Sequence, residues 1–98
     1  MLNQFVIVGR ITKHNQIDDK HSKLKIKVMK ECKNEEGLYE ADIIPIELTG
    51  SIMTNVQQYC KKEDVVGVKG KITTKNNMVV LKAEKVSFLS SKNSEEEE

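Results

Sequence analysis

The chain has 98 residues, of which 38% are hydrophobic and 32% are charged, a composition typical of one small soluble domain. No apolar run reaches the roughly 18 to 20 residues that a membrane-spanning helix needs, and the N-terminus lacks the basic region and long apolar stretch of a secretory signal. The sequence therefore predicts a cytoplasmic protein with no membrane partner.

The net charge of +1 hides an uneven distribution of charge along the chain. Four of the 15 acidic residues form the run Glu95–Glu98, and without them 16 basic and 11 acidic residues leave a body of +5. A basic body with an acidic tail is typical of a domain that binds a polyanion, with the tail competing for the basic surface. A basic surface kept for solubility is the alternative. We predict that residues 90–98 form a disordered acidic tail.

The N-terminal part of the chain predicts two strands. Residues 4–13 are an apolar run with Gly9 as a bend, and residues 14–22 are a polar loop. Residues 23–30 then alternate strictly between apolar and polar side chains, which predicts a half-buried strand with an open, lysine-rich face. The inward set is Leu24, Ile26 and Val28, and the outward set is Lys23, Lys25, Lys27 and Met29.

A third strand follows a turn. Residues 32–42 indicate a hairpin connection around Gly37, and residues 42–49 read as a strand. Because Pro45 has no N–H to donate, this strand is expected at an edge or bulged at that point. Its inward residues are Ile44, Ile46 and Leu48, and its outward residues are Ile43, Glu47 and Thr49.

The apolar period changes to that of a helix between residues 51 and 62. Gly50 or Ser51 is available as the N-terminal cap. Lys61 and Lys62 end the segment, which suits the negative end of the helix dipole.

Two more strands complete the domain. Residues 64–75 form one strand, Asn76-Asn77 is a tight turn because Asn tolerates positive φ, and residues 78–89 form the other. The order of strands and helix predicts an all-β fold, a five-stranded OB-fold barrel with one helix between strands three and four, over residues 1–89. Another α+β sandwich is the alternative. The inward face of the fourth strand holds Val66, Val68, Gly70 and Ile72.

Four segments resemble bacterial single-stranded DNA-binding proteins, in the same order as in that family. They are MLNQFVIVGRITK, KNEEGLYEADIIPIEL, NVQQYCKKEDVVGVKGKITTK and AEKVSFL, and together they span roughly residues 1 to 89. The resemblance implies an OB fold that forms a homodimer or homotetramer and binds single-stranded DNA with little sequence preference. It also implies a nucleoid-associated role in replication, recombination or repair, with replication or repair proteins as further partners, and it implies no cofactor.

Such binding combines a basic groove along the phosphates with aromatic side chains that stack on bases. Tyr39 is the one aromatic residue in a loop expected to reach DNA; a loop tyrosine that covers the core edge is the alternative. The residues expected to bind nucleic acid match basic positions of the family, lie on the outward faces, or occupy a stacking position: Arg10, Lys25, Lys27, Lys30, Tyr39, Thr49, Lys69, Lys71, Lys75 and Lys82.

The chain departs from the family in its aromatic residues. Cys32, Ile43 and Thr49 stand where relatives often carry aromatic side chains, and the chain has no Trp. The usually long hairpin between strands four and five is reduced to Asn76-Asn77, and the acidic tail lacks the terminal apolar residues that recruit partners in the family. Weaker binding than in a relative with stacking side chains is therefore expected.

The histidines, cysteines and candidate catalytic residues predict neither a metal site nor an enzymatic reaction. His14, His21, Cys32 and Cys60 lack metal-ligand spacing, and both thiols are expected to be reduced and partly buried. Nucleophile–base pairs and phosphate-binding loops are missing, so we predict that the protein is not an enzyme. Two alternatives to DNA binding are a protein-interaction module like the family's primosomal paralogue and an RNA-binding module. Three aromatic residues are expected in the core: Phe5, Tyr59 and Phe88.

Overall fold

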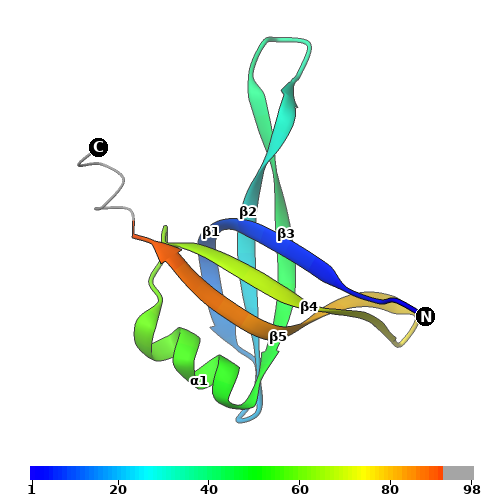
Figure 1. The fold of residues 1–98 in the computed structure, drawn as a ribbon, viewed down its shortest axis with the longest axis vertical. Helices are drawn as coiled ribbons and strands as arrows, with labels where there is room; N and C mark the ends of the chain where they lie inside the picture. Colours follow the sequence, from blue (N-terminus) through cyan, green and yellow to red (C-terminus); the bar gives the residue numbers. More distant parts are fainter. Residues whose placement is uncertain (92–98) are drawn as a thin grey trace.

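The computed structural model describes residues 1–91. Of the predicted tail 90–98, Ser90 belongs to the last strand, which corrects the predicted boundary, and residues 92–98 lie outside the described residues. Five strands and one helix follow one another along the chain (Figure 1). They are β1 (Phe5–Gln16), β2 (His21–Lys33), β3 (Tyr39–Thr49), α1 (Gly50–Tyr59), β4 (Val65–Lys75) and β5 (Met78–Ser90).

The strands close into a barrel in the order β1-β2-β3-β5-β4, with β4 pairing back to β1. All neighbours are antiparallel except β3 and β5, which meet in parallel at the single pair Glu47 and Lys82. The predicted all-β class and OB-fold order, with the helix between β3 and β4, are confirmed. None of the helices among residues 1–91 is long and apolar enough to cross a membrane.

The core confirms the alternation that predicted β2 and β3. Side chains from successive inward positions of three strands are fully shielded from water, and each such burial contributes about 1.5 to 3 kcal/mol. The helix covers one end of the barrel with Met53 and Val56, which are also buried. The shielded strand residues are Leu24, Ile26, Ile46, Leu48, Val66 and Val68.

β1 is shared between two neighbours. Its first half pairs with β4 and its second half with β2, with a shift of register between Ile11 and Lys13. This bulge lies at Thr12 and not at Gly9, where a bend was predicted. Gly9 meets a different need, since a Cβ there would overlap the backbone of Lys27 on β2. The bulge turns both Arg10 and Lys13 to the outside of the barrel, opposite Lys27 and Lys25.

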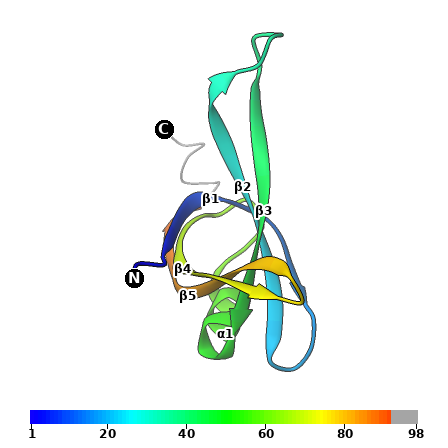
Figure 2. The same cartoon turned by 90° about the vertical axis from the view of Figure 1, so that its right-hand side faces the viewer.

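Strands β2 and β3 run past the barrel as a long two-stranded arm, which Figure 2 shows rising above it. The predicted loop 14–22 shrinks to residues 17–20, and the predicted connection 32–42 shrinks to residues 34–38. Gly37 lies in that turn with φ 81°, as expected of its centre. The arm was missed because both of its faces meet solvent, so no strict apolar alternation marks it.

The β4–β5 hairpin also extends from the barrel. Asn76 and Asn77 have φ of 54° and 64°, which confirms the predicted two-residue turn. The two strands stay paired up to the turn, with Lys75 opposite Met78. Ile72 keeps its predicted register but lies beyond the barrel interior and is exposed.

The helix differs from its prediction at both ends. It ends at Tyr59, so Lys61 and Lys62 follow it rather than occupying its last turn. Thr49 is the N-cap and forms no side-chain capping hydrogen bond, which corrects the expected Gly50 or Ser51 cap.

Of the three aromatic residues expected in the core, the structure buries Phe5 alone. Tyr59 is 71% exposed and Phe88 is 53% exposed, and both line a hollow between α1 and β5. Their apolar spacing was correct, but they lie at the end of the barrel, where the short helix does not reach across.

Pro45 lies where the sequence requires an edge. It pairs with Lys25 of β2, while the ladder pair between β3 and β5 within residues 1–91 is at Glu47, two residues further on. The side of β3 turned away from β2 therefore has no paired strand at Pro45, which confirms the edge prediction.

Candidate nucleic-acid interface

The outer surface of β1, β2 and β3 gathers basic side chains. Cross-strand partners share a face of a sheet, and Lys13 lies opposite Lys25 while Arg10 lies opposite Lys27. On the paired part of these strands, the outward acidic residue is Glu47, opposite Lys23. We call this surface the lysine face; its basic residues are Arg10, Lys13, Lys23, Lys25, Lys27 and Lys33.

The lysine face continues onto the arm. Lys33 pairs with Tyr39, and its ammonium lies 5.5 Å from the centre of the tyrosine ring. Tyr39 is 55% exposed and Ile43, on the same side of β3, is 51% exposed. The ammonium–ring contact holds an aromatic surface beside a positive charge, which is the combination that stacks a base and neutralises its phosphate.

Lys30 lies on the opposite side of the arm, which corrects its predicted place beside Lys25 and Lys27. Its ammonium is 3.5 Å from a Glu40 carboxylate oxygen and 3.7 Å from one of Asp42. A hydrogen bond from the Asn34 amide, and then the charge of Lys30, lower the pKa of Glu40. Part of the positive charge of Lys30 is therefore balanced within the arm.

Two of the predicted lysines adjoin the lysine face across Glu47. Lys82 of β5 pairs with Glu47, and Lys71 of β4 pairs with Lys82. The Lys71 ammonium lies 3.7 Å from the Glu84 carboxylate. The barrel thus carries a row of charges from β2 around to β4.

Lys75 and Lys69 lie further from the lysine face than Lys82 and Lys71 do. Lys75 ends β4 at the tip of the β4–β5 hairpin. Lys69 lies opposite Lys85 and Val6, on the part of the outer surface where β1, β4 and β5 pair. The structure therefore does not bring these two lysines together with Lys25 and Lys27.

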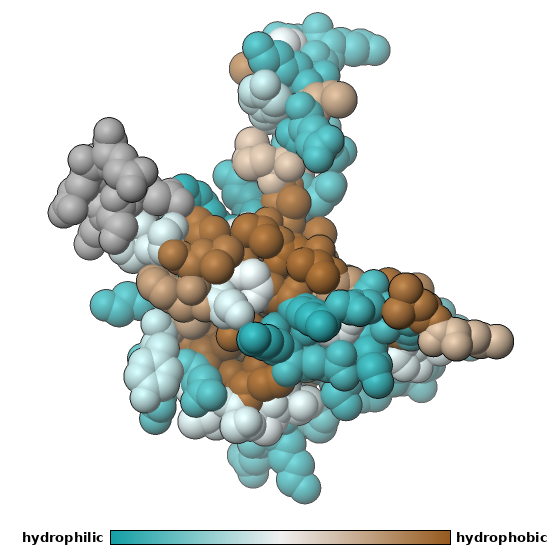
Figure 3. All heavy atoms as spheres, viewed as in Figure 1, coloured by the Kyte–Doolittle hydropathy of each residue, from teal (hydrophilic) through white to brown (hydrophobic). Residues whose placement is uncertain are grey.

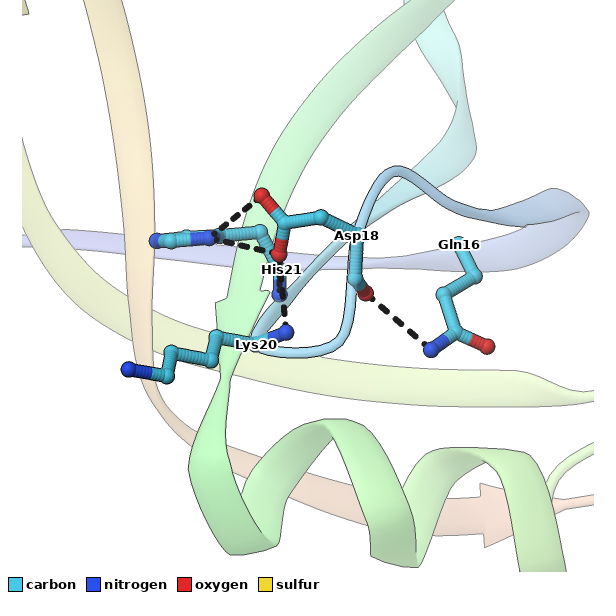
Figure 4. A network of polar contacts seen from close by, with 4 residues as sticks. All are labelled: Gln16, Asp18, Lys20 and His21. Atoms are coloured by element: carbon cyan, nitrogen blue, oxygen red, sulfur yellow. Dashed lines mark hydrogen bonds and ion pairs between the residues drawn. The ribbon is translucent and has the colours of Figure 1, made fainter.

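Thr49 ends β3 beside the turn that joins β1 to β2. It lines a hollow of about 520 Å³ together with Lys20, His21 and Lys82. In this turn the Asp18 carboxylate accepts hydrogen bonds from the backbone N–H groups of Lys20, at 2.7 Å, and His21, at 2.8 Å (Figure 4). The bond from Lys20, followed by the contact with the His21 ring, lowers the pKa of Asp18.

Arg10 has a structural contact besides its place on the lysine face. Its Nη1 donates a hydrogen bond of 3.0 Å to the carbonyl oxygen of Glu63. This bond ties the loop before β4 to β1, so the half-buried guanidinium is held at a defined position at the end of the face.

The histidines and cysteines form no metal site within residues 1–91. The His14 ring pairs with the Ser22 hydroxyl at 2.7 Å, and the His21 ring contacts Asp18. Cys60 is half-buried, and this burial raises the pKa of its thiol. Cys32 is exposed on the arm, which corrects the expectation that it is partly buried.

The set of residues expected to bind nucleic acid left out three members of the lysine face: Lys23, whose outward direction was predicted, and Lys13 and Lys33. Lys13 was assigned to the first strand without a face, because its outward direction depends on the bulge at Thr12. Lys33 was placed in a loop, because β2 was predicted to end at residue 30. The ring of Tyr39 six residues later was the available signal, since a short hairpin pairs such positions.

The chain is similar to known proteins over most of its length. The model of the Single-strand binding protein family matches residues 2–88. Single-stranded DNA-binding protein 1 of Clostridium acetobutylicum is 32% identical over 77 residues, 72% of this chain and 70% of that protein. Single-stranded DNA-binding protein B of Bacillus subtilis is 32% identical over 81 residues, 78% of this chain and 72% of that protein.

A solved structure supports the same fold. A small single-stranded DNA binding protein from Mycoplasma pneumoniae superposes with a TM-score of 0.71 at 20% identity, over 88% of this chain and 92% of that chain. The family match spans all five strands and the helix of the barrel. The chain therefore belongs to the single-strand binding protein family.

Proposed function

We propose that the chain binds single-stranded DNA without strong sequence preference, in replication, recombination or repair, and that the phosphates follow the lysine face. The observation that carries the proposal is six basic side chains on one outer surface whose outward acidic residue is Glu47. Lysines bind phosphates as point charges and do not read base edges, so the role is sequence-tolerant binding without catalysis.

The proposed contact residues follow this surface and its continuation across Glu47. Tyr39 is the aromatic side chain of the face, so electrostatic contacts carry most of the proposed binding energy. Lys30, Lys69 and Lys75 are left outside the proposed path because they lie away from this surface. The proposed contacts that the sequence also predicts are Arg10, Lys25, Lys27, Tyr39, Thr49, Lys71 and Lys82.

Fluorescence anisotropy with labelled oligo-dT of increasing length tests the proposal, starting near 20 mM salt. Each phosphate neutralised contributes about −0.7 to the slope of log affinity against log salt. Six contacts on the lysine face therefore give an expected slope near −4. No binding at tens of micromolar protein would instead favour a protein-interaction module, and tighter binding of oligo-U would favour RNA.

We also propose that the chain forms a homodimer or homotetramer through an apolar patch on the outer surface of β1. Figure 3 shows this patch on the barrel at the base of the arm. Val6, Val8 and Leu89 are all more than half exposed, and Val8 and Leu89 both pack over Gly67 of β4. Contiguous exposed apolar surface of this kind marks an interface with another protein.

Sedimentation equilibrium tests self-association. We expect Val8→Glu to weaken it at least about tenfold, because a carboxylate would lose its hydration inside an apolar interface. Val79→Glu is the matched control, since Val79 is also an exposed valine, 70% against 54% for Val8, but lies on the β4–β5 hairpin. A wild-type protein that stays monomeric at tens of micromolar would contradict the proposal.

A further inference from the structure

A second basic surface lies beside the lysine face, in a hollow between β1 and the end of α1. The hollow has a volume of about 570 Å³. Its rim carries Lys13, His14, Lys61 and Lys62, and its apolar floor includes the buried side chains of Ile11 and Val56. In Figure 1 the second half of β1 passes behind α1, which brings these distant parts of the sequence together.

The loop after α1 is held in place by hydrogen bonds to β1. The backbone N–H of Glu63 donates to the carbonyl oxygen of Ile11 at 2.8 Å, and the N–H of Ile11 donates to the carbonyl oxygen of Asp64 at 2.9 Å. Glu63 has φ 78°, a left-handed conformation that reverses the chain between α1 and β4. Lys61 and Lys62 are therefore fixed beside Lys13 and are not on a free loop.

The carboxylates nearest the hollow form no ion pair with the lysines of its rim. Asp64 is buried, and its carboxylate accepts the backbone N–H of Lys61 at 2.8 Å. Neither Asp64 nor Glu63 lines the hollow. Within residues 1–91, the three lysines of the rim form no ion pair, whereas Lys30 and Lys71 do. Burial, and then the charge of Asp64, raise the pKa of the Cys60 thiol, so the charge of Asp64 reaches the lining. Three ammonium groups against this buried carboxylate still leave the hollow positive, which favours an anionic ligand.

We propose that this hollow binds the sugar–phosphate backbone of the single-stranded DNA as it leaves the lysine face. The two surfaces share an edge, because Lys13 on the rim lies opposite Lys25 on the face. The ligand class is the phosphodiester, since the rim offers three ammonium groups and no Phe, Tyr or Trp ring for a base, and the His14 ring is half-buried and bonded to the Ser22 hydroxyl. This inference rests on the proposed function and extends the path of the strand to the end of α1.

The test compares short and long oligo-dT, measured by anisotropy near 0.1 M salt. The double variant Lys61→Gln/Lys62→Gln removes two exposed positive charges from the rim. Lys85→Gln removes one positive charge from the outer surface of β5, away from the hollow, and is the control for a general loss of charge. A strand just long enough to cover the lysine face is expected to bind the double variant as it binds the wild type. A longer strand is expected to lose about 25-fold in affinity, with a salt slope smaller by about 1.4.

The single variants Lys61→Gln and Lys62→Gln are each expected to cost the long strand about fivefold, and Lys85→Gln less than twofold. Equal losses for short and long strands, or no loss beyond the control, would overturn the inference. In both cases the wild-type protein still binds the short strand. Failure of the proposed function itself would appear differently, as no binding of either length. Thermal unfolding of each variant checks that these exposed substitutions leave the fold intact.

Discussion

Replacing Lys25 and Lys27 by glutamine is expected to weaken oligo-dT binding about 25-fold at 0.1 M salt, the loss that two phosphate contacts account for. Both lysines lie at the centre of the lysine face, between basic residues of β1 and outward residues of β3. Because phosphates are the same in every sequence, the loss is expected to be equal for oligo-dT and oligo-dC, and the salt slope is expected to shrink by about 1.4.

Lys30→Gln is the variant that tests whether the DNA follows one side of the sheet. From the sequence, Lys30 belongs with Lys25 and Lys27, but in the structure it contacts Glu40 and Asp42 on the other side of the arm. We therefore expect a smaller loss per charge for Lys30→Gln than for either face lysine, measured as a salt titration of each variant. Equal losses at all three positions would show that the strand does not follow one side of the sheet.

Gly70→Ala is expected to destabilise the fold by about 3 kcal/mol, at the upper end of the cost of overpacking a core. Gly70 of β4 pairs with Phe5 of β1 on one side and with Ala83 of β5 on the other. A Cβ at this position would overlap the Lys82 carbonyl oxygen and lie 2.8 Å from a ring carbon of Phe5. The carbonyl belongs to a paired strand, so relief requires moving the backbone of β5.

Gly67→Ala is the matched control on the same strand. A Cβ there would meet only Leu89 and Val8, at 3.7 and 3.9 Å, which is ordinary contact. Urea unfolding followed by far-UV circular dichroism measures both variants, and the free energy of unfolding of Gly67→Ala is expected to stay within about 1 kcal/mol of the wild type. Similar stability of the two variants would contradict the close approach of β5 to β4.

The positions that lack family aromatics have a clear place in the structure. Ile43 and Thr49 both lie on the outward side of β3, the side that carries Tyr39. Cys32 is exposed on the arm. The missing aromatic side chains would therefore have been accessible to a bound strand, which agrees with a face that relies on charge more than on stacking.

The sequence by itself determined the elements of the barrel and the side chains that fill its interior. Strict alternation in residues 23–30 and 42–49 identified the side chains that fill the barrel, because burial on one face of a strand forces a period of two. Asn76-Asn77 and Gly37 identified two turns, because few residue types adopt positive φ. The order of strands and helix followed from these local signals.

Only the tertiary structure decided which exposed side chains lie together on the outer surface. The bulge at Thr12 depends on the pairing of β1 with β2, and it sets the direction of Lys13. Exposed arms carry no apolar period, so the sequence did not show that β2 continues to Lys33 or that Lys30 meets Glu40 and Asp42 of β3. Lys13 and Lys61 meet because backbone hydrogen bonds join β1 to the loop after α1. Burial leaves a pattern in the sequence, whereas the meeting of solvated side chains is set by register, bulges and loop closure.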